Sequence, residues 1–186
     1  MSAGNERRRV VVTGLGVVSP LAVGLPDTWQ GLLEGRSGIR ELPEATGPVR
    51  IAGEVPDFDP DEILGWRTAR QYDRFAQLAV VAAREARAMA GLPDGAGDER
   101  TSAVVGTGLG GIGAHQRAVE ALAAGRRSVS AYTGVSMVPS AATAAVAIEA
   151  GARGPALTPA TACASGTDAI GFGTDLIRWG RADVVL

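Results

Sequence analysis

The chain has 186 residues, of which 46% are hydrophobic, and its formal net charge at pH 7 is −2. This composition excludes a disordered chain, and the near-neutral charge offers no basic face for nucleic acid. All 18 basic residues are arginines, so a Walker A lysine is absent, and one cysteine with one histidine cannot form a zinc site. A single free cysteine is compatible with a reducing cytoplasm, where we expect the protein to reside.

The N-terminal stretch combines three arginines at positions 7–9 with an apolar run, an arrangement that is also typical of signal peptides. Gly14, Gly16 and Pro20 interrupt the run. We therefore interpret the three valines at positions 10–12 as part of a β-branched strand, buried on both faces, that extends to Ser19. No stretch reaches the roughly 18 consecutive apolar residues of a membrane span, so we expect none.

The next segment mixes short elements with loops. The sequence Pro26-Asp27-Thr28-Trp29 opens a short helix that we expect to reach about residue 33. Four prolines between residues 40 and 61 predict a loop, with a short strand at 49–53 and one helical turn around Ile63.

A long alanine-rich helix is predicted from Tyr72 to about Ala90, where Gly91 and Pro93 stop it. Its apolar side indicates a core helix, and the residues expected to face the core are Phe75, Leu78, Ala79, Ala82 and Ala86. A second β-branched strand is expected at residues 101–106.

A glycine cluster follows that strand, and Gly106, Gly108 and Gly111 satisfy the G-x-G-x-x-G pattern of dinucleotide-binding domains. That pattern requires an acidic residue about 20 positions later to hold the ribose. The next two acids downstream are Glu120, which is too near, and Glu149, which is too far. We therefore discount an NAD(P)-binding domain, although it stays an alternative.

The only histidine, His115, lies on the polar side of the helix expected after the glycines, and we predict that it faces solvent. Residues 128–136 indicate a loop, and residues 138–150 a second alanine-rich helix. A strand is predicted at residues 184–186.

The only cysteine, Cys163, lies between an apolar run at residues 156–160 and a segment with helical spacing of apolar residues. This order predicts a strand, a sharp turn and a helix, with the thiol at the helix N-terminus, where backbone N–H groups favour the reactive thiolate. Small neighbours would let a substrate carbonyl approach the sulfur. The alternative is an inert buried cysteine that acts as a small hydrophobe, and local sequence alone leaves both open.

The hexapeptide Thr161-Ala162-Cys163-Ala164-Ser165-Gly166 resembles the active-site motif of β-ketoacyl-acyl-carrier-protein synthases. The N-terminal VVVTGLGVVSPL, the sequence EGRSGI at 34–39 and GARGP at 151–155 resemble the same family. The resemblance implies an α/β, thiolase-like fold, in which a mixed sheet is flanked by helices and residues 1–186 form the first of two repeats. It also implies that the chain is truncated, because the family's two histidines, its lysine and its Gly-Phe-Gly-Gly turn belong to the second repeat.

In the reaction that the resemblance implies, Cys163 accepts an acyl group from acyl carrier protein, and the acyl thioester then condenses with malonyl-carrier protein under loss of carbon dioxide. Leu109 is a candidate acyl-binding residue. Met137 and Val138 are candidate acyl-tunnel or interface residues, although ordinary core packing explains them equally well. His115 matches neither family histidine, so we do not expect the chain alone to condense.

The resemblance also implies the partners and cofactors. Acyl carrier protein is the expected partner and brings the phosphopantetheine arm, so we expect no cofactor or metal in the chain itself. The complete enzyme is expected to form a homodimer or a ketosynthase heterodimer. Two alternatives to this function stay open besides the NAD(P)-binding domain: a non-catalytic half or partner subunit that only docks, and a thiolase-fold enzyme that takes acyl groups from coenzyme A.

Overall fold

The computed structural model describes residues 8–42, 47–95 and 97–186 and has an α/β architecture. Three parallel strands form its sheet in the order β4 (Ala156–Leu157), β3 (Thr101–Val104), β5 (Val184–Val185). The register pairs Val104 with Leu157 on one side of β3, and Ser102 with Val185 on the other. Both of the strands predicted from β-branched runs at 101–106 and 184–186 are therefore confirmed.

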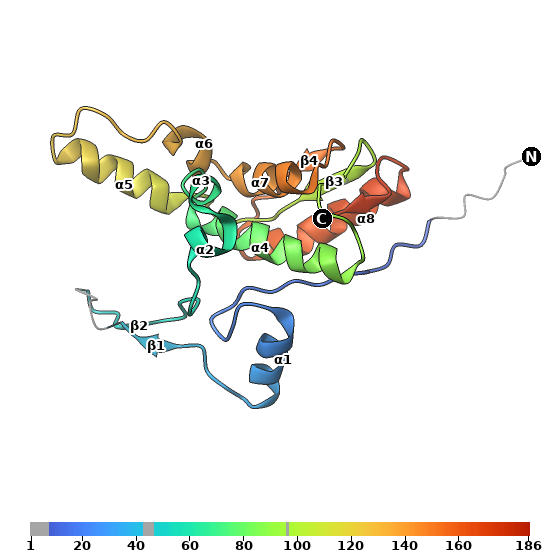
Figure 1. Cartoon of the computed structure of the whole chain (residues 1–186), viewed down its shortest axis with the longest axis horizontal. Helices are drawn as coiled ribbons and strands as arrows, with labels where there is room; N and C mark the ends of the chain where they lie inside the picture. Colours follow the sequence, from blue (N-terminus) through green and yellow to red (C-terminus); the bar gives the residue numbers. More distant parts are fainter. Residues whose placement is uncertain (1–7, 43–46, 96) are drawn as a thin grey trace, which may run out of the picture.

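The helices cover both faces of this sheet. Ala103 packs in one cluster with α4 (Arg74–Met89) and α7 (Ala141–Ala150), whereas its neighbour Val104 packs with α8 (Ser165–Arg178). Successive strand residues point to opposite faces, so α4 and α7 lie on one side of the sheet and α8 on the other. Figure 1 shows these elements together, with α5 (Ile112–Ala123) projecting away from them.

The core between α4, α7 and β3 is built mainly from alanine. Ala76, Ala103 and Ala145 are completely buried, and Val80 and Val146 fill the remaining space beside them. Small side chains let two helices and a strand approach closely, and the resulting interior is dense. The α4 bounds agree with the predicted helix, but its buried face is shifted. Of the predicted core residues, Phe75 and Ala79 are half-buried and pack against this core, as predicted. Leu78, Ala82 and Ala86 are half-buried outside the cluster, while Ala76 and Val80 lie within it.

The strand predicted at residues 10–19 is wrong. Val11 and Val12 are 71% and 77% exposed, and only Val18 makes a bridge, to Val23. The physical reason lies in Gly14 and Gly16, where a Cβ would lie 1.9 Å from the carbonyl oxygen of Ala86 and 1.8 Å from that of Ala82, respectively. The segment therefore runs across the backbone of α4 and not along a sheet edge.

The shorter elements largely follow the sequence. Helix α1 (Leu25–Leu33), α2 (Pro60–Leu64) and α7 confirm the predicted helices, and α3 (Trp66–Ala69) follows α2. Two short strands, β1 (Arg40–Glu41) and β2 (Ile51–Ala52), form a separate antiparallel pair that lies near α1 in Figure 1. The loop predicted at 128–136 is partly wrong, because α6 (Thr133–Met137) forms there.

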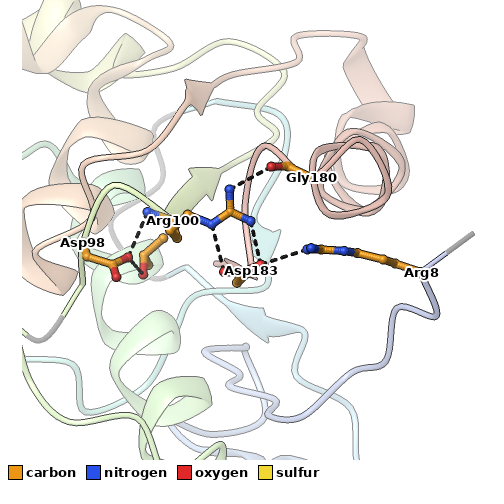
Figure 2. A network of polar contacts seen from close by, with 6 residues as sticks. Arg8, Asp98, Arg100, Gly180 and Asp183 are labelled. Atoms are coloured by element: carbon orange, nitrogen blue, oxygen red, sulfur yellow. Dashed lines mark hydrogen bonds and ion pairs between the residues drawn. The ribbon is translucent and has the colours of Figure 1, made fainter.

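A polar network joins the first described residues to the other end of the chain. Figure 2 shows Arg8 and Arg100 converging on the Asp183 carboxylate, at 2.9 Å and 2.7 Å, and Arg100 also donates to the Gly180 carbonyl oxygen at 2.7 Å. Hydrogen bonding from Arg100, followed by that from Arg8, lowers the pKa of Asp183 to about 2. Asp98 accepts from the Arg100 backbone N–H at the same place. In the described part of the chain, no helix is long and apolar enough to cross a bilayer.

Candidate active site

Cys163 lies where the sequence predicts it, on a turn between a strand and a helix. The chain leaves β4 at Leu157, passes through a 3₁₀ turn, η1 (Ala162–Ala164), and enters α8 at Ser165. The thiol is exposed. The alternative of a buried and inert cysteine is therefore not what the structure shows. A thiol at this point faces solvent at the N-terminal end of a 14-residue helix, where backbone N–H groups favour negative charge.

The backbone of this turn is strained. Ala162, the residue before the cysteine, has a φ of 54°, in the left-handed region that costs a residue with a Cβ about 1–2 kcal/mol. Such a conformation persists only where the surrounding contacts fix it. Ser165 supplies several of these contacts and is 3% exposed. Its Oγ accepts from the Thr161 N–H at 2.9 Å and lies within donating distance of the carbonyl oxygens of Ala162 (2.7 Å) and Thr107 (3.1 Å).

The glycine cluster packs directly against this turn. A Cβ on Gly106 would lie 2.1 Å from the Ser165 carbonyl oxygen, so only glycine lets the end of β3 approach the start of α8 this closely. The Thr107 N–H donates to the Pro159 carbonyl oxygen at 3.1 Å. The glycine cluster therefore contacts the residues on both sides of the Cys163 turn, Pro159 before it and Ser165 after it.

The other end of the cluster contacts the C-terminal end of α6 and the residues that follow it. A Cβ on Gly111 would lie 2.1 Å from the Ser136 carbonyl oxygen, and the Gly111 N–H donates to the Met137 carbonyl oxygen at 3.1 Å. The structure thus brings the turn that carries Leu109 between the Cys163 turn and the Met137-Val138 segment. Leu109 is 72% exposed, and Met137 and Val138 are 37% and 40% exposed. In the described structure Met137 and Val138 are therefore not part of the buried core.

The dinucleotide interpretation fails on the same geometry. In such domains the helix N-terminus after the glycines receives the pyrophosphate. Here Asp73 occupies that position, because its carboxylate accepts from the Ala114 N–H at 3.0 Å and pairs with Arg117 at 2.6 Å. Burial raises the pKa of Asp73, but the hydrogen bonds from Arg117 and Ala114 outweigh it, so the pKa lies below its ordinary value. A buried carboxylate already neutralises the start of α5.

Several residues of the site escaped the sequence interpretation. Thr143 on α7 is 2% exposed, and its hydroxyl contacts the Thr158 hydroxyl at 2.6 Å and the Leu157 carbonyl oxygen at 3.3 Å. It thereby fixes the strand that leads to the cysteine. The only available signal was a lone threonine in an alanine-rich helix. Ser165 and Asp168, which both bond to Thr161, were also missed.

The described residues contain few other groups with chemistry near the thiol. His115 is exposed on α5, as predicted. Within the described ranges, no three residues of the His, Cys, Asp and Glu types come together in a way that could hold a metal ion. The chemistry that the arrangement itself offers is that of one accessible thiol at a helix start.

Comparison with known proteins gives a consistent result. The model of the family described as "Beta-ketoacyl synthase, N-terminal domain" matches residues 7–186. The chain is 36% identical, over 98% of its length, to 3-oxoacyl-[acyl-carrier-protein] synthase 2 of Staphylococcus aureus strain N315. It is 42% identical, over the same share, to the ketoacyl synthase alpha subunit of the tetracenomycin polyketide synthase of Streptomyces glaucescens.

Solved structures agree. The ishigamide ketosynthase/chain length factor is similar to 96% of this chain with a TM-score of 0.83 and 33% sequence identity. The matched part is 46% of that chain, and the chain spans 45% of the length of both curated relatives.

Proposed function

The chain belongs to the β-ketoacyl synthase N-terminal domain family and has its thiolase-like α/β fold, and from this premise we propose that it carries the acyl-accepting thiol of a β-ketoacyl-acyl-carrier-protein synthase. The observation that carries the proposal is the position of Cys163, exposed on a strained turn at the start of α8. Cys163 is the only cysteine of the sequence, so no other residue can supply a nucleophilic thiol.

In the proposed reaction the Cys163 thiolate attacks the carbonyl carbon of an acyl thioester on acyl carrier protein. The tetrahedral intermediate places negative charge on the carbonyl oxygen, which backbone N–H groups at the start of a helix can stabilise. The carbon–sulfur bond to the carrier's phosphopantetheine arm then breaks, the carrier thiolate leaves and takes up a proton from solvent, and the acyl group stays on Cys163. The arm belongs to the carrier, so no cofactor of the chain itself enters this step.

Condensation requires more groups than the described residues supply. Loss of carbon dioxide from malonyl-carrier protein develops an enolate, whose charge must be received by hydrogen-bond donors beside the acyl-cysteine. His115 projects into solvent from α5 and does not fill this role. We propose that the donors come from a second unit that completes the site, because the chain spans less than half of its relatives.

The proposal also covers substrate contacts, assembly and location. Leu109, Met137 and Val138 are proposed to line the path of the acyl chain, because exposed apolar side chains on adjoining segments suit an alkyl group. In its complete form the enzyme is proposed to be a homodimer or a heterodimer of two ketosynthase-type subunits. An exposed catalytic thiol is best preserved in a reducing compartment, which favours the cytoplasm.

The test is an intact-mass measurement after the purified chain is incubated with an acyl-acyl-carrier-protein. We expect a mass increase equal to one acyl group, located on the peptide that contains Cys163, and no increase in Cys163→Ser. Acyl-coenzyme A, offered separately, distinguishes a carrier-dependent enzyme from one that uses coenzyme A. An unmodified Cys163 in a folded chain, as judged by circular dichroism, contradicts the acyl-acceptor role and favours a non-catalytic docking unit.

A second assay addresses the completeness of the site. The acylated chain is mixed with malonyl-carrier protein, and the product is analysed by mass spectrometry of the carrier. We expect no β-ketoacyl-carrier protein from the chain alone. Formation of that product by the chain alone would overturn the proposal that a second unit supplies the enolate-binding groups, while leaving Cys163 as the acyl acceptor.

A further inference from the structure

The left-handed backbone of Ala162 follows Thr161, a residue that two side chains of α8 hold by hydrogen bonds. Ser165 holds the Thr161 backbone N–H, which fixes one end of the strained peptide unit. The side chain of Thr161 is held separately, because its hydroxyl donates to the carboxylate of Asp168. Thr161 is thus tied to α8 at two points, one on its backbone and one on its side chain.

The two ties come from one helix. Ser165 and Asp168 are three positions apart on α8, so they lie on the same side of its first turn and both reach back to Thr161. Ser165 is buried, whereas Asp168 is half-buried at the surface of the turn. With Thr161 fixed in this way, the chain has three residues, Ala162, Cys163 and Ala164, in which to reverse direction before α8 begins at Ser165. The first of these three, Ala162, takes the positive φ.

On the premise of the proposed function, we propose that Asp168 is a positioning residue for acyl transfer, which acts through Thr161 to hold the strained turn that presents the Cys163 thiol. It does not contact the reacting atoms. Its carboxylate fixes the side chain of Thr161, Thr161 fixes the backbone of Ala162, and Ala162 sets the direction in which the cysteine leaves the turn.

The proposal is tested with Asp168→Ala and Thr161→Val, each of which removes one partner of the hydrogen bond. We expect each to slow acylation of Cys163 about tenfold, the effect of losing one hydrogen bond to a charged group. The double variant is expected to be no slower than either single variant, since both remove the same interaction. Asp168→Asn keeps an oxygen that accepts from the Thr161 hydroxyl and should restore most of the rate.

A matched control lies on the same helix. Asp175→Ala removes a carboxylate from α8 about two turns further along and should leave the acylation rate unchanged. Rates are measured well below each variant's thermal unfolding midpoint. Variants that lower only that midpoint, while the folded protein reacts at the wild-type rate, would overturn a positioning role. So would additive losses in the double variant, or a failure of Asp168→Asn to react faster than Asp168→Ala.

Alkylation of Cys163 by iodoacetamide separates this proposal from the proposed function. If the wild-type chain is not acylated by the carrier thioester, the acyl-acceptor role fails. The alkylation rates of the same variants then still report how the turn presents the thiol, and we expect Asp168→Ala and Thr161→Val to be slower than wild type and Asp175→Ala. Equal alkylation rates in all variants would overturn the positioning role by itself.

Discussion

The strands β3, β4 and β5 and the helices α4, α7 and α8 form the layers of the molecule, in which α4 and α7 meet through alanines that exclude water. The N-terminal region, residues 8–42 and 47–57, reaches the same helix α4 through backbone and carboxylate contacts of residues 14–25. The buried hydrophobic side chains of the described chain all lie between Phe58 and Ala182. In the N-terminal region, Gly14 and Gly16 lie on α4 carbonyl groups, and the Glu85 carboxylate accepts from the N–H groups of Val17 and Leu25. Figure 1 shows this region running past the layers and not through them.

The layers, and not the N-terminal region, control the geometry of the site. The layers set the position of Cys163, because α8 follows its turn directly, Gly106 and Thr107 after β3 pack against Ser165, and Thr143 on α7 holds the strand that leads to the turn. Apolar burial ties these elements together. The N-terminal region depends on a few polar attachments, which water can replace. We therefore expect it to open locally without unfolding the layers, and we expect changes inside the layers to be felt throughout them.

The largest effect is expected from Gly106→Ala, which breaks the layers at the active-site turn. A new Cβ would lie 2.1 Å from the Ser165 carbonyl oxygen, a backbone atom that cannot move without shifting α8. We expect a loss of about 3 kcal/mol in the free energy of unfolding and slower acylation of Cys163. Urea denaturation measures the first. The control is Gly171→Ala on α8, where a Cβ meets open space and which should be neutral or stabilising. Equal stability of the two variants would contradict the close-approach argument.

The same division explains what the sequence could predict. Local signals placed α4, β3 and the turn of Cys163, because capping, periodicity and glycine positions act over a few residues. Contacts between distant residues were missed: Ser165 bonds across 58 positions to Thr107, and Asp73 across 41 positions to Ala114. The valines at 10–12 were misjudged because an apolar run does not reveal whether another part of the molecule covers it, and Val11 and Val12 are exposed. Helix α6 was missed because its five residues are too few to show a period.

The second-largest effect is expected from Glu85→Ala, which breaks the attachment of the N-terminal region to α4. The carboxylate accepts from the Val17 N–H at 2.8 Å and from the Leu25 N–H at 2.6 Å. Losing both bonds from a half-buried site should cost about 2 kcal/mol locally. We expect faster amide hydrogen exchange over residues 14–25, with little change in α4 and α7. Glu120→Ala on the exposed face of α5 is the control. Equal acceleration of exchange in the layers would show that the two regions unfold together.

A third, pH-dependent effect concerns the attachment of α5 to α4 by Asp73. Because the pKa of this carboxyl is lowered in the folded protein, its ion pair with Arg117 stabilises the fold above the ordinary carboxyl pKa of about 4. That contribution is lost as the pH falls through the lowered folded value. In Asp73→Asn we expect about 1 kcal/mol less stability at neutral pH, because Arg117 is largely exposed, and a smaller difference from wild type at pH 3 than at pH 6. Urea midpoints across this range measure it, and a constant difference would rule out the titration.

The smallest effect is expected from Arg8→Ala, which removes the outermost attachment of the N-terminal region. Arg8 meets Asp183 in solvent, and Arg100 holds the same carboxylate and also the Gly180 carbonyl oxygen (Figure 2). The layers should keep their unfolding midpoint, while amide exchange near residues 8–12 becomes faster at low salt and equals the wild type at high salt, where the pair is screened. Because Arg100 is the main cause of the lowered pKa of Asp183, we expect this pKa to rise less in Arg8→Ala than in Arg100→Ala. NMR titration of the Asp183 carboxyl measures both pKa values. A larger rise of the pKa in Arg8→Ala than in Arg100→Ala would show that the N-terminal region and not the layers sets the charge state at this end of the sheet.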